Sequence, residues 1–339
     1  MKYKKQILFS SLITVAFASL ANNASADVTK INNNTALNLD GSYLGGVAPT
    51  GSDLLLIDST NMSGATTPSL GDNVSILGIS ASSTNNLTVG NTAGKTLTIG
   101  ASGITKSAAG QLVFNNATSL GGNITMATGT GPITFGGGLT LAANQTWALG
   151  NGRIFLTSAL TTGGNTLGIS GTSGSIVDLR NVTIGSEVTI GTLGLVYVNA
   201  GTVTINGTNN TNAEFKIFSG TANIASMGNV GGASSIGTSN TASGGVNGAY
   251  VQSGNTLNYT GNTFSSNKGF SRGNNGTSTI GVTTSGQTLS MSGNLTTTAV
   301  TGGWSLGGAG TRTLSGHIAN GTCTTVAKTG LGTLTRSGA

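Results

Sequence analysis

The chain has 339 residues, of which 57 are glycine and only 6% are charged. Glycine therefore makes up about 17% of the chain against a usual share of roughly 7%, and charged residues fall far below the roughly 25% of ordinary soluble proteins. The 3 prolines exclude collagen, and a mean hydropathy of +0.14 argues against disorder. With 8 acids, 14 bases and 1 histidine, the composition disfavours enzymes that need several titratable groups.

The first 26 residues have the order of a secretory signal peptide. Three lysines within the first five residues precede an apolar stretch at 7–20, and the sequence Ala24-Ser25-Ala26 follows. This order predicts cleavage after Ala26, at the motif formed by Ala24 and Ala26, and a mature chain that begins at Asp27. The apolar stretch is too short to favour a membrane-spanning helix. We therefore expect an exported protein.

Two further expectations follow from export, one on the binding partners and one on the cysteine. Removal of the three lysines lowers the formal net charge from +6 to +3, and the remaining bases are scattered singly, so no nucleic-acid partner is expected. Cys323 is the only cysteine. No internal disulfide can form in this chain, and Cys323 is expected to be a small, inert side chain.

Short apolar-x-apolar triplets with a central threonine recur along the mature chain. Examples are Leu87-Thr88-Val89, Leu97-Thr98-Ile99, Ile133-Thr134-Phe135, Leu139-Thr140-Leu141, Val182-Thr183-Ile184, Val188-Thr189-Ile190 and Val203-Thr204-Ile205. Such alternation has the period of a strand with one buried face. Gly, Asn, Ser and Thr separate the triplets at intervals of about 6 to 12 residues, as turns between short strands require.

Short strands at short intervals suit an all-β sandwich, a propeller or a β-solenoid. Only 5% of the residues are aromatic, and the triplets are nearly interchangeable, as expected where each coil contacts only its neighbours. We therefore predict a β-solenoid of roughly 12 to 16 coils, with roughly 20 to 25 residues per coil and a length of roughly 60 to 75 Å. Val, Ile and Leu should stack inside, Thr, Ser and Asn should face outward, and glycine should occupy the crowded corners.

Longer motifs follow in a fixed order along residues 42–339. They are SYLGGVAPTGSD at 42–53, GIT at 103–105, LAANQTW at 141–147, GNTLNYTGNT at 254–263, KGF at 268–270, GQTLSMSG at 286–293 and KTGLGTLTRSGA at 328–339. Each is similar to a motif of exported proteins that carry autotransporter-associated β-strand repeats. Tyr43, Lys268 and Arg336 stand where that family usually has tryptophan, arginine and an apolar residue. The resemblance implies a right-handed parallel β-helix displayed outside the cell.

In that family such a rod is a passenger, carried across the outer membrane by a C-terminal β-barrel. This sequence stops at Ala339, where the family normally continues, and has no series of amphipathic strands that would form a barrel. We therefore interpret residues 1–26 as a signal peptide and residues 27–339 as a passenger-like repeat domain truncated at its C-terminal end. A translocating barrel would be a separate partner, and the open end of the solenoid is expected to self-associate.

Motifs for known chemistry are weak. The segment 90–96 has three residues between its glycines where a phosphate-binding loop needs four. The segment 171–175 resembles a serine-protease motif, but His317 is the only histidine and is expected in an exposed turn. The aspartates show no calcium-binding period. We predict no catalytic, cofactor-binding or metal-binding residue.

The leading hypothesis is an exported, non-enzymatic, adhesin-like structural protein at the cell surface or outside the cell, associated with the outer membrane, with an unknown surface or matrix ligand. The alternative is a polysaccharide-active lyase or glycosidase, in which Glu187 and Glu214 on neighbouring coils would form the carboxylate pair near Arg180. A third hypothesis, a carbohydrate- or matrix-binding module, needs exposed aromatic residues in a row. The candidates are too widely spread in the sequence to predict one: Trp147, Tyr197, Tyr250, Tyr259 and Trp304.

Overall fold

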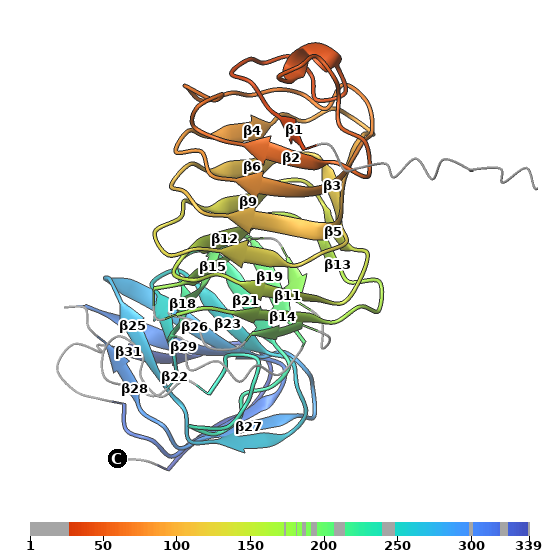
Figure 1. Ribbon diagram of the computed structural model, residues 1–339. Helices are drawn as coiled ribbons and strands as arrows, with labels where there is room; N and C mark the ends of the chain where they lie inside the picture. The colour runs from red at the N-terminus through yellow and green to blue at the C-terminus, as the bar shows by residue number, and fades with distance from the viewer. Residues whose placement is uncertain are drawn as a thin grey trace, which may run out of the picture.

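The chain folds into stacked coils of short parallel strands, in a computed structural model (Figure 1). The structure describes residues 27–172, 174–180, 182–184, 188–190, 195–206, 214–238, 248–297, 301–318 and 325–337. The coils run from the red N-terminal end to the blue C-terminal end of one elongated body. There are about 12 turns, so the predicted β-solenoid is confirmed at the lower end of the predicted coil number.

In the described part of the chain the strands form four sheets, and the strand pairs within them are parallel. The eleven-stranded sheet contains β1 (Val28–Thr29), β2 (Leu54–Ile57), β3 (Val74–Ala81), β5 (Thr96–Lys106), β7 (Ala117–Leu120), β8 (Ile124–Met126), β10 (Leu139–Leu141), β11 (Gln145–Ala148), β13 (Leu160–Thr161), β14 (Leu167–Ser170) and β17 (Val188–Ile190). The ten-stranded sheet contains β4 (Leu87–Val89), β6 (Leu112–Phe114), β9 (Ile133–Phe135), β12 (Arg153–Leu156), β15 (Ile176–Arg180), β18 (Leu195–Ala200), β20 (Glu214–Ile217), β22 (Gly248–Gln252), β25 (Gly269–Gly273) and β28 (Leu295–Thr297).

Two further sheets build the C-terminal part of the rod. The seven-stranded sheet contains β16 (Thr183–Ile184), β19 (Thr202–Ile205), β21 (Thr221–Ile224), β23 (Thr256–Tyr259), β26 (Gly276–Val282), β29 (Gly302–Gly308) and β31 (Thr325–Lys328). The four-stranded sheet contains β24 (Phe264–Ser266), β27 (Thr288–Met291), β30 (Thr311–Leu314) and β32 (Leu334–Arg336). Every triplet quoted from the sequence lies within or overlaps one of these strands.

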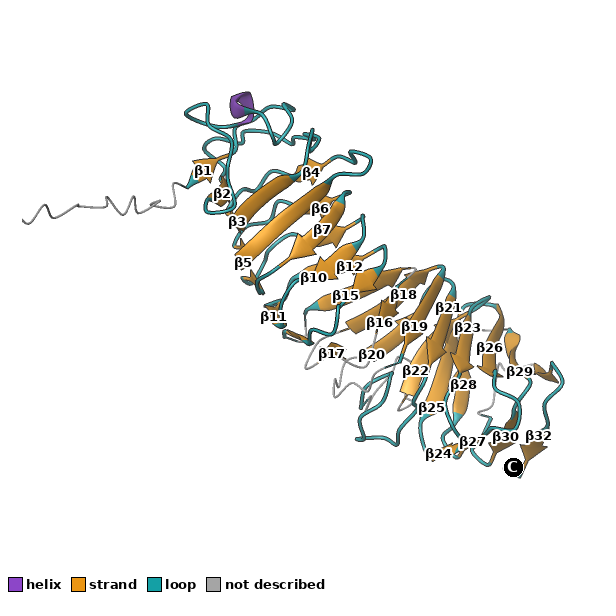
Figure 2. Cartoon of the chain, turned by 90° about the vertical axis from the view of Figure 1, so that its right-hand side faces the viewer, coloured by secondary structure: helices purple, strands orange, loops and turns teal. Residues whose placement is uncertain are grey.

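Each turn contributes up to three strands, one to each side of the rod. In chain order β6, β7 and β8 are followed by β9, β10 and β11, and each strand pairs with its counterpart in the next turn. The long strand β5 bends round a corner, so its first half pairs with β7 and its second half pairs with β8. Figure 2 shows the same stack from the side. A side chain on one strand therefore lies directly above its partner one coil earlier.

The N-terminal end of the rod is covered by a loop that includes the short 3-10 helix η1 (Asp40–Ser42) (Figure 2). Tyr43 is buried there and donates its hydroxyl hydrogen to the carbonyl oxygen of Leu37 at 2.5 Å. Among the described residues, no helix has the length and apolarity to cross a lipid bilayer.

Apolar side chains stack in ladders inside the rod. One ladder of register partners is formed by Ile79, Ile104, Ile124, Trp147 and Ile169. These five side chains are at most 2% exposed. Since successive strands lie about 4.8 Å apart, each side chain packs on the one above and the one below. The core is therefore continuous along the rod.

Glycine is required where two coils touch at a corner. Gly103 has a φ of 60°, which is costly for other residues. A Cβ atom at Gly103 would also overlap the backbone oxygen of Asn123 in the next coil. In the described residues, Asn274 is the only residue other than glycine with a positive φ. The predicted placement of glycine at crowded corners is confirmed.

Candidate ligand-binding face

The charged residues in the middle of the chain gather on one side of the rod. Between residues 107 and 267, the described part of the chain has five charged side chains: Arg153, Asp178, Arg180, Glu214 and Lys216. All five lie on β12, β15 and β20 of the ten-stranded sheet. We call the outward side chains of β12, β15, β18, β20 and β22, with those of the residues that directly follow these strands, the binding face.

The register of the sheet creates a row of unlike side chains across this face. Phe155 pairs with Asp178, Asp178 pairs with Tyr197, Tyr197 pairs with Lys216, and Lys216 pairs with Tyr250. Elsewhere the corresponding positions carry threonine, valine or serine, for example Thr88, Val113 and Thr134. The binding face therefore interrupts the plain outer surface that the sequence predicts.

Two guanidinium groups contact one aromatic ring at one end of the face. Arg153 Cζ lies 5.4 Å from the centroid of the Phe155 ring, and Arg180 Cζ lies 5.3 Å from the same centroid. Both distances are within the range of an attractive cation–π contact. Arg153 and Phe155 share the outward side of β12 because they are two residues apart on one strand.

Both carboxylates of the face are paired with cations. Asp178, which is 1% exposed, accepts from Arg180 Nε at 3.0 Å and from Asn199 Nδ2 at 3.2 Å. Glu214 Oε2 lies 2.9 Å from Lys216 Nζ on the same strand. Arg153 has no carboxylate partner among the described residues. Among the residues that the structure describes, the face therefore carries one positive charge that no acid neutralises.

Aromatic rings continue along the face beyond the arginines. The rings of Tyr197 and Phe218 have centroids 4.8 Å apart at 72°, and those of Phe218 and Tyr250 are 6.1 Å apart at 41°. Lys216 Nζ lies 5.6 Å from the centroid of Tyr250. The interpretation that the aromatic residues are too widely spread to form a row is therefore wrong for Tyr197 and Tyr250. The other three candidates are buried in the core: Trp147, Tyr259 and Trp304.

Two hollows adjoin each other on this side of the rod. The larger has a volume of about 590 Å³ and is lined by residues that include Gln111, Thr134, Asn151, Phe155 and Arg180. The smaller has a volume of about 190 Å³ and is lined by Asp178, Tyr197, Asn199 and Phe218. Arg153 lines both hollows. The unneutralised guanidinium thus lies where they meet.

The residues of the enzyme hypothesis are only partly described. Glu187 and Ser173 lie outside the described residues. Glu214 forms an ion pair with Lys216. Arg180, the expected neighbour of Glu214, is instead bound to Asp178.

His317 is exposed and follows a turn, as expected. Within the described ranges, no group of three or more His, Cys, Asp or Glu residues could hold a metal ion.

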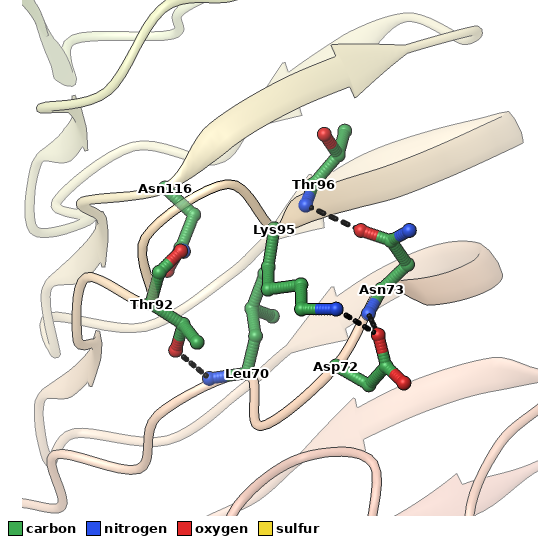
Figure 3. A network of polar contacts seen from close by, with 7 residues as sticks. All are labelled: Leu70, Asp72, Asn73, Thr92, Lys95, Thr96 and Asn116. Carbon is green, nitrogen blue, oxygen red and sulfur yellow. Dashed lines mark hydrogen bonds and ion pairs between the residues drawn. The ribbon is translucent and has the colours of Figure 1, made fainter.

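A second polar cluster, at the corner before β3 and β5, has a different role (Figure 3). Lys95 Nζ lies 2.7 Å from Asp72 Oδ1, and Asn73 Oδ1 accepts the backbone N–H of Thr96 at 2.9 Å. The hydrogen bond from Lys95 lowers the pKa of Asp72. Each contact joins one coil to the next. The cluster fixes the stacking of two coils.

The signal-peptide prediction, with its cleavage motif at Ala24 and Ala26, lies outside the described residues, as does Cys323. Comparisons of the chain with protein-family models, with characterised proteins and with solved structures found no match.

Proposed function

We propose that this chain is an exported, non-enzymatic β-solenoid that serves as a structural protein at the cell surface or outside the cell and adheres to a ligand through the binding face. The observation that carries the proposal is the concentration of rings and charges on one side of the rod. Tyr and Arg are the residue types that contribute most to binding energy at interfaces. Stacked coils hold these side chains at fixed spacing, as a preorganised site requires.

The N-terminal segment supports export, and the order of motifs resembling autotransporter-associated repeats supports a passenger-like role. Both described carboxylates of the face, Asp178 and Glu214, are engaged in ion pairs, which favours binding over catalysis by a free carboxylate pair. A rod with one adhesive side fits a ligand that extends along the rod.

Adhesion can be tested with the full chain expressed in a secreting host and coupled to beads. We expect the beads to be retained on at least one surface in a panel of immobilised matrix polymers and cell-surface glycans. A variant with Tyr197→Ser and Phe218→Ser should lose retention by roughly tenfold or more, because it removes two neighbouring rings. The protein secreted by the host should begin at Asp27.

The matched control carries Thr204→Ser and Asn223→Ser, which change outward positions on β19 and β21 of another sheet. It should be retained as well as the unchanged chain. Retention that is the same for all three proteins, or absent on every surface, would contradict adhesion through this face.

A further inference from the structure

The charge balance of the binding face indicates the kind of ligand. Its five charged side chains are three cations and two carboxylates, and each carboxylate already has a cation partner. Arg153 contacts the Phe155 ring and no carboxylate among the described residues. A partly buried guanidinium without an acid partner favours a ligand that supplies one, since its planar fork binds carboxylates through two parallel hydrogen bonds.

The shape of the face indicates an extended ligand. The hollows that meet at Arg153 extend from Gln111, just before β6, to Phe218, just after β20. These two strands belong to coils separated by five strand spacings, which corresponds to roughly 24 Å along the rod. A single small molecule would fill only part of that length. A linear polymer lying along the rod would use both hollows.

The remaining side chains match the chemistry of sugars. The exposed ring of Phe218 and the partly exposed ring of Tyr197 offer apolar surfaces against which the C–H faces of sugar rings can pack. The hollows are also lined by Gln111, Asn151 and Asn199, whose amide groups can form hydrogen bonds with hydroxyl groups. Rings with a few placed polar groups are typical of ligand sites.

We propose, resting on the adhesive function proposed above, that the binding face takes a linear polysaccharide carrying carboxylate groups, and that Arg153 binds a carboxylate of this polymer. The aromatic rings hold the sugar backbone, and Arg153 selects acidic over neutral chains. No covalent step is involved.

The test measures the affinity of the full chain for polygalacturonate, alginate and hyaluronate, each beside its methyl ester, by biolayer interferometry. The ester keeps the backbone and removes the charge. We expect at least one acidic polymer to bind roughly tenfold or more tightly than its ester. One hydrogen bond between two charged groups accounts for a difference of this size. Added salt should weaken the binding of the acid and not of the ester.

Substitutions of Arg153 test whether the difference in affinity between acid and ester depends on its side chain. Arg153→Gln should reduce the affinity for the acidic polymer by roughly tenfold and leave the ester unaffected. Arg153→Lys keeps the charge but loses the planar fork, so its affinity should be intermediate. The matched control Lys95→Gln removes a cation at a distant corner and should change nothing. Thermal unfolding of each variant shows that the rod is intact.

Equal affinity for acid and ester, or an equal loss in Lys95→Gln, would overturn the carboxylate assignment. Tighter binding of single-stranded DNA of similar length would point to a general polyanion site and would also overturn it. A failure of all three acidic polymers and all three esters to bind would overturn it as well. Each of these results leaves the adhesive function standing if the bead assay still depends on Tyr197 and Phe218, so the two proposals can fail separately.

Discussion

Three buried lysines hold backbone carbonyl groups in the interior of the rod. Lys30, Lys106 and Lys268 are at most 1% exposed. Lys30 Nζ donates to the carbonyl oxygens of Ile31 and Asn33 at 2.8 and 3.0 Å, and Lys268 Nζ donates to Ser234 Oγ at 3.0 Å and to a backbone carbonyl. Burial lowers the pKa of each ammonium from 10.5 to about 8.

These pKa values predict an unusual dependence of stability on pH. Between about pH 8 and pH 10.5 the unfolded chain keeps protons on the three lysines that the folded chain has released, so the free energy of unfolding should rise with pH. Each lysine could contribute up to about 3 kcal/mol. Burial raises the pKa of Tyr43. The folded chain therefore retains that proton at high pH, and stability should fall again above about pH 10.

Urea unfolding followed by circular dichroism at several pH values measures this rise. Lys106→Met removes one titrating group and should reduce the slope, whatever it does to the stability at neutral pH. Lys95→Met removes a partly exposed lysine and keeps the three buried ones, so the rise should remain. A stability that stays flat or declines between about pH 8 and pH 10 would show that the carbonyl contacts keep the lysines protonated.

At the scale of the element, asparagines extend the hydrogen-bond ladder around the corners. Asn86, Asn123 and Asn144 each precede a strand, and their side-chain oxygens accept the backbone N–H of Gln111, Thr146 and Thr166 at 2.8, 2.8 and 2.9 Å. In each case the register places the donor directly over the asparagine in the next coil. The asparagine side chain thus accepts a hydrogen bond from a backbone N–H group at the point where a strand begins.

Asn123→Ala should lower the free energy of unfolding by about 1 kcal/mol, because it removes one such hydrogen bond. Asn91→Ala is the matched control, since Asn91 is exposed just before a turn and has no side-chain hydrogen bond within the described structure. Denaturant midpoints of the two variants measure the difference. An equal loss in both variants would mean that the corner bond contributes nothing beyond the general effect of replacing asparagine.

The strands could be predicted from the sequence because each needs only a triplet with one buried face, as at β4 and β9. The binding face could not be predicted, because the coils differ in length. Leu195 pairs with Glu214, 19 residues later, whereas Phe215 pairs with Ala249, 34 residues later. No fixed period brings Tyr197 and Tyr250 to one side. The buried lysines were missed because a single charge at the end of a strand or next to one carries no sign of burial.

At the scale of the whole molecule, the rod is a one-dimensional stack. The described strands pair with their neighbours in adjacent coils, and no strand pairing joins the described strands of distant coils. The two tryptophans make this testable, since Trp147 in β11 and Trp304 in β29 are both fully buried in coils far apart along the rod. Figure 2 shows β11 and β29 in separate parts of the stack.

Truncating either tryptophan to alanine should cost about 3–5 kcal/mol locally, because it opens a cavity in the core ladder. In hydrogen-exchange mass spectrometry, Trp147→Ala should therefore speed exchange in β8, β11 and β14 and leave β26 and β29 protected. Trp304→Ala should give the reverse pattern, so each variant serves as the control for the other. If both variants deprotected the whole rod equally, the coils would unfold as a single cooperative unit. A local response to Trp304→Ala would mean that the C-terminal coils can be weakened while β12 and β15 of the binding face keep their geometry.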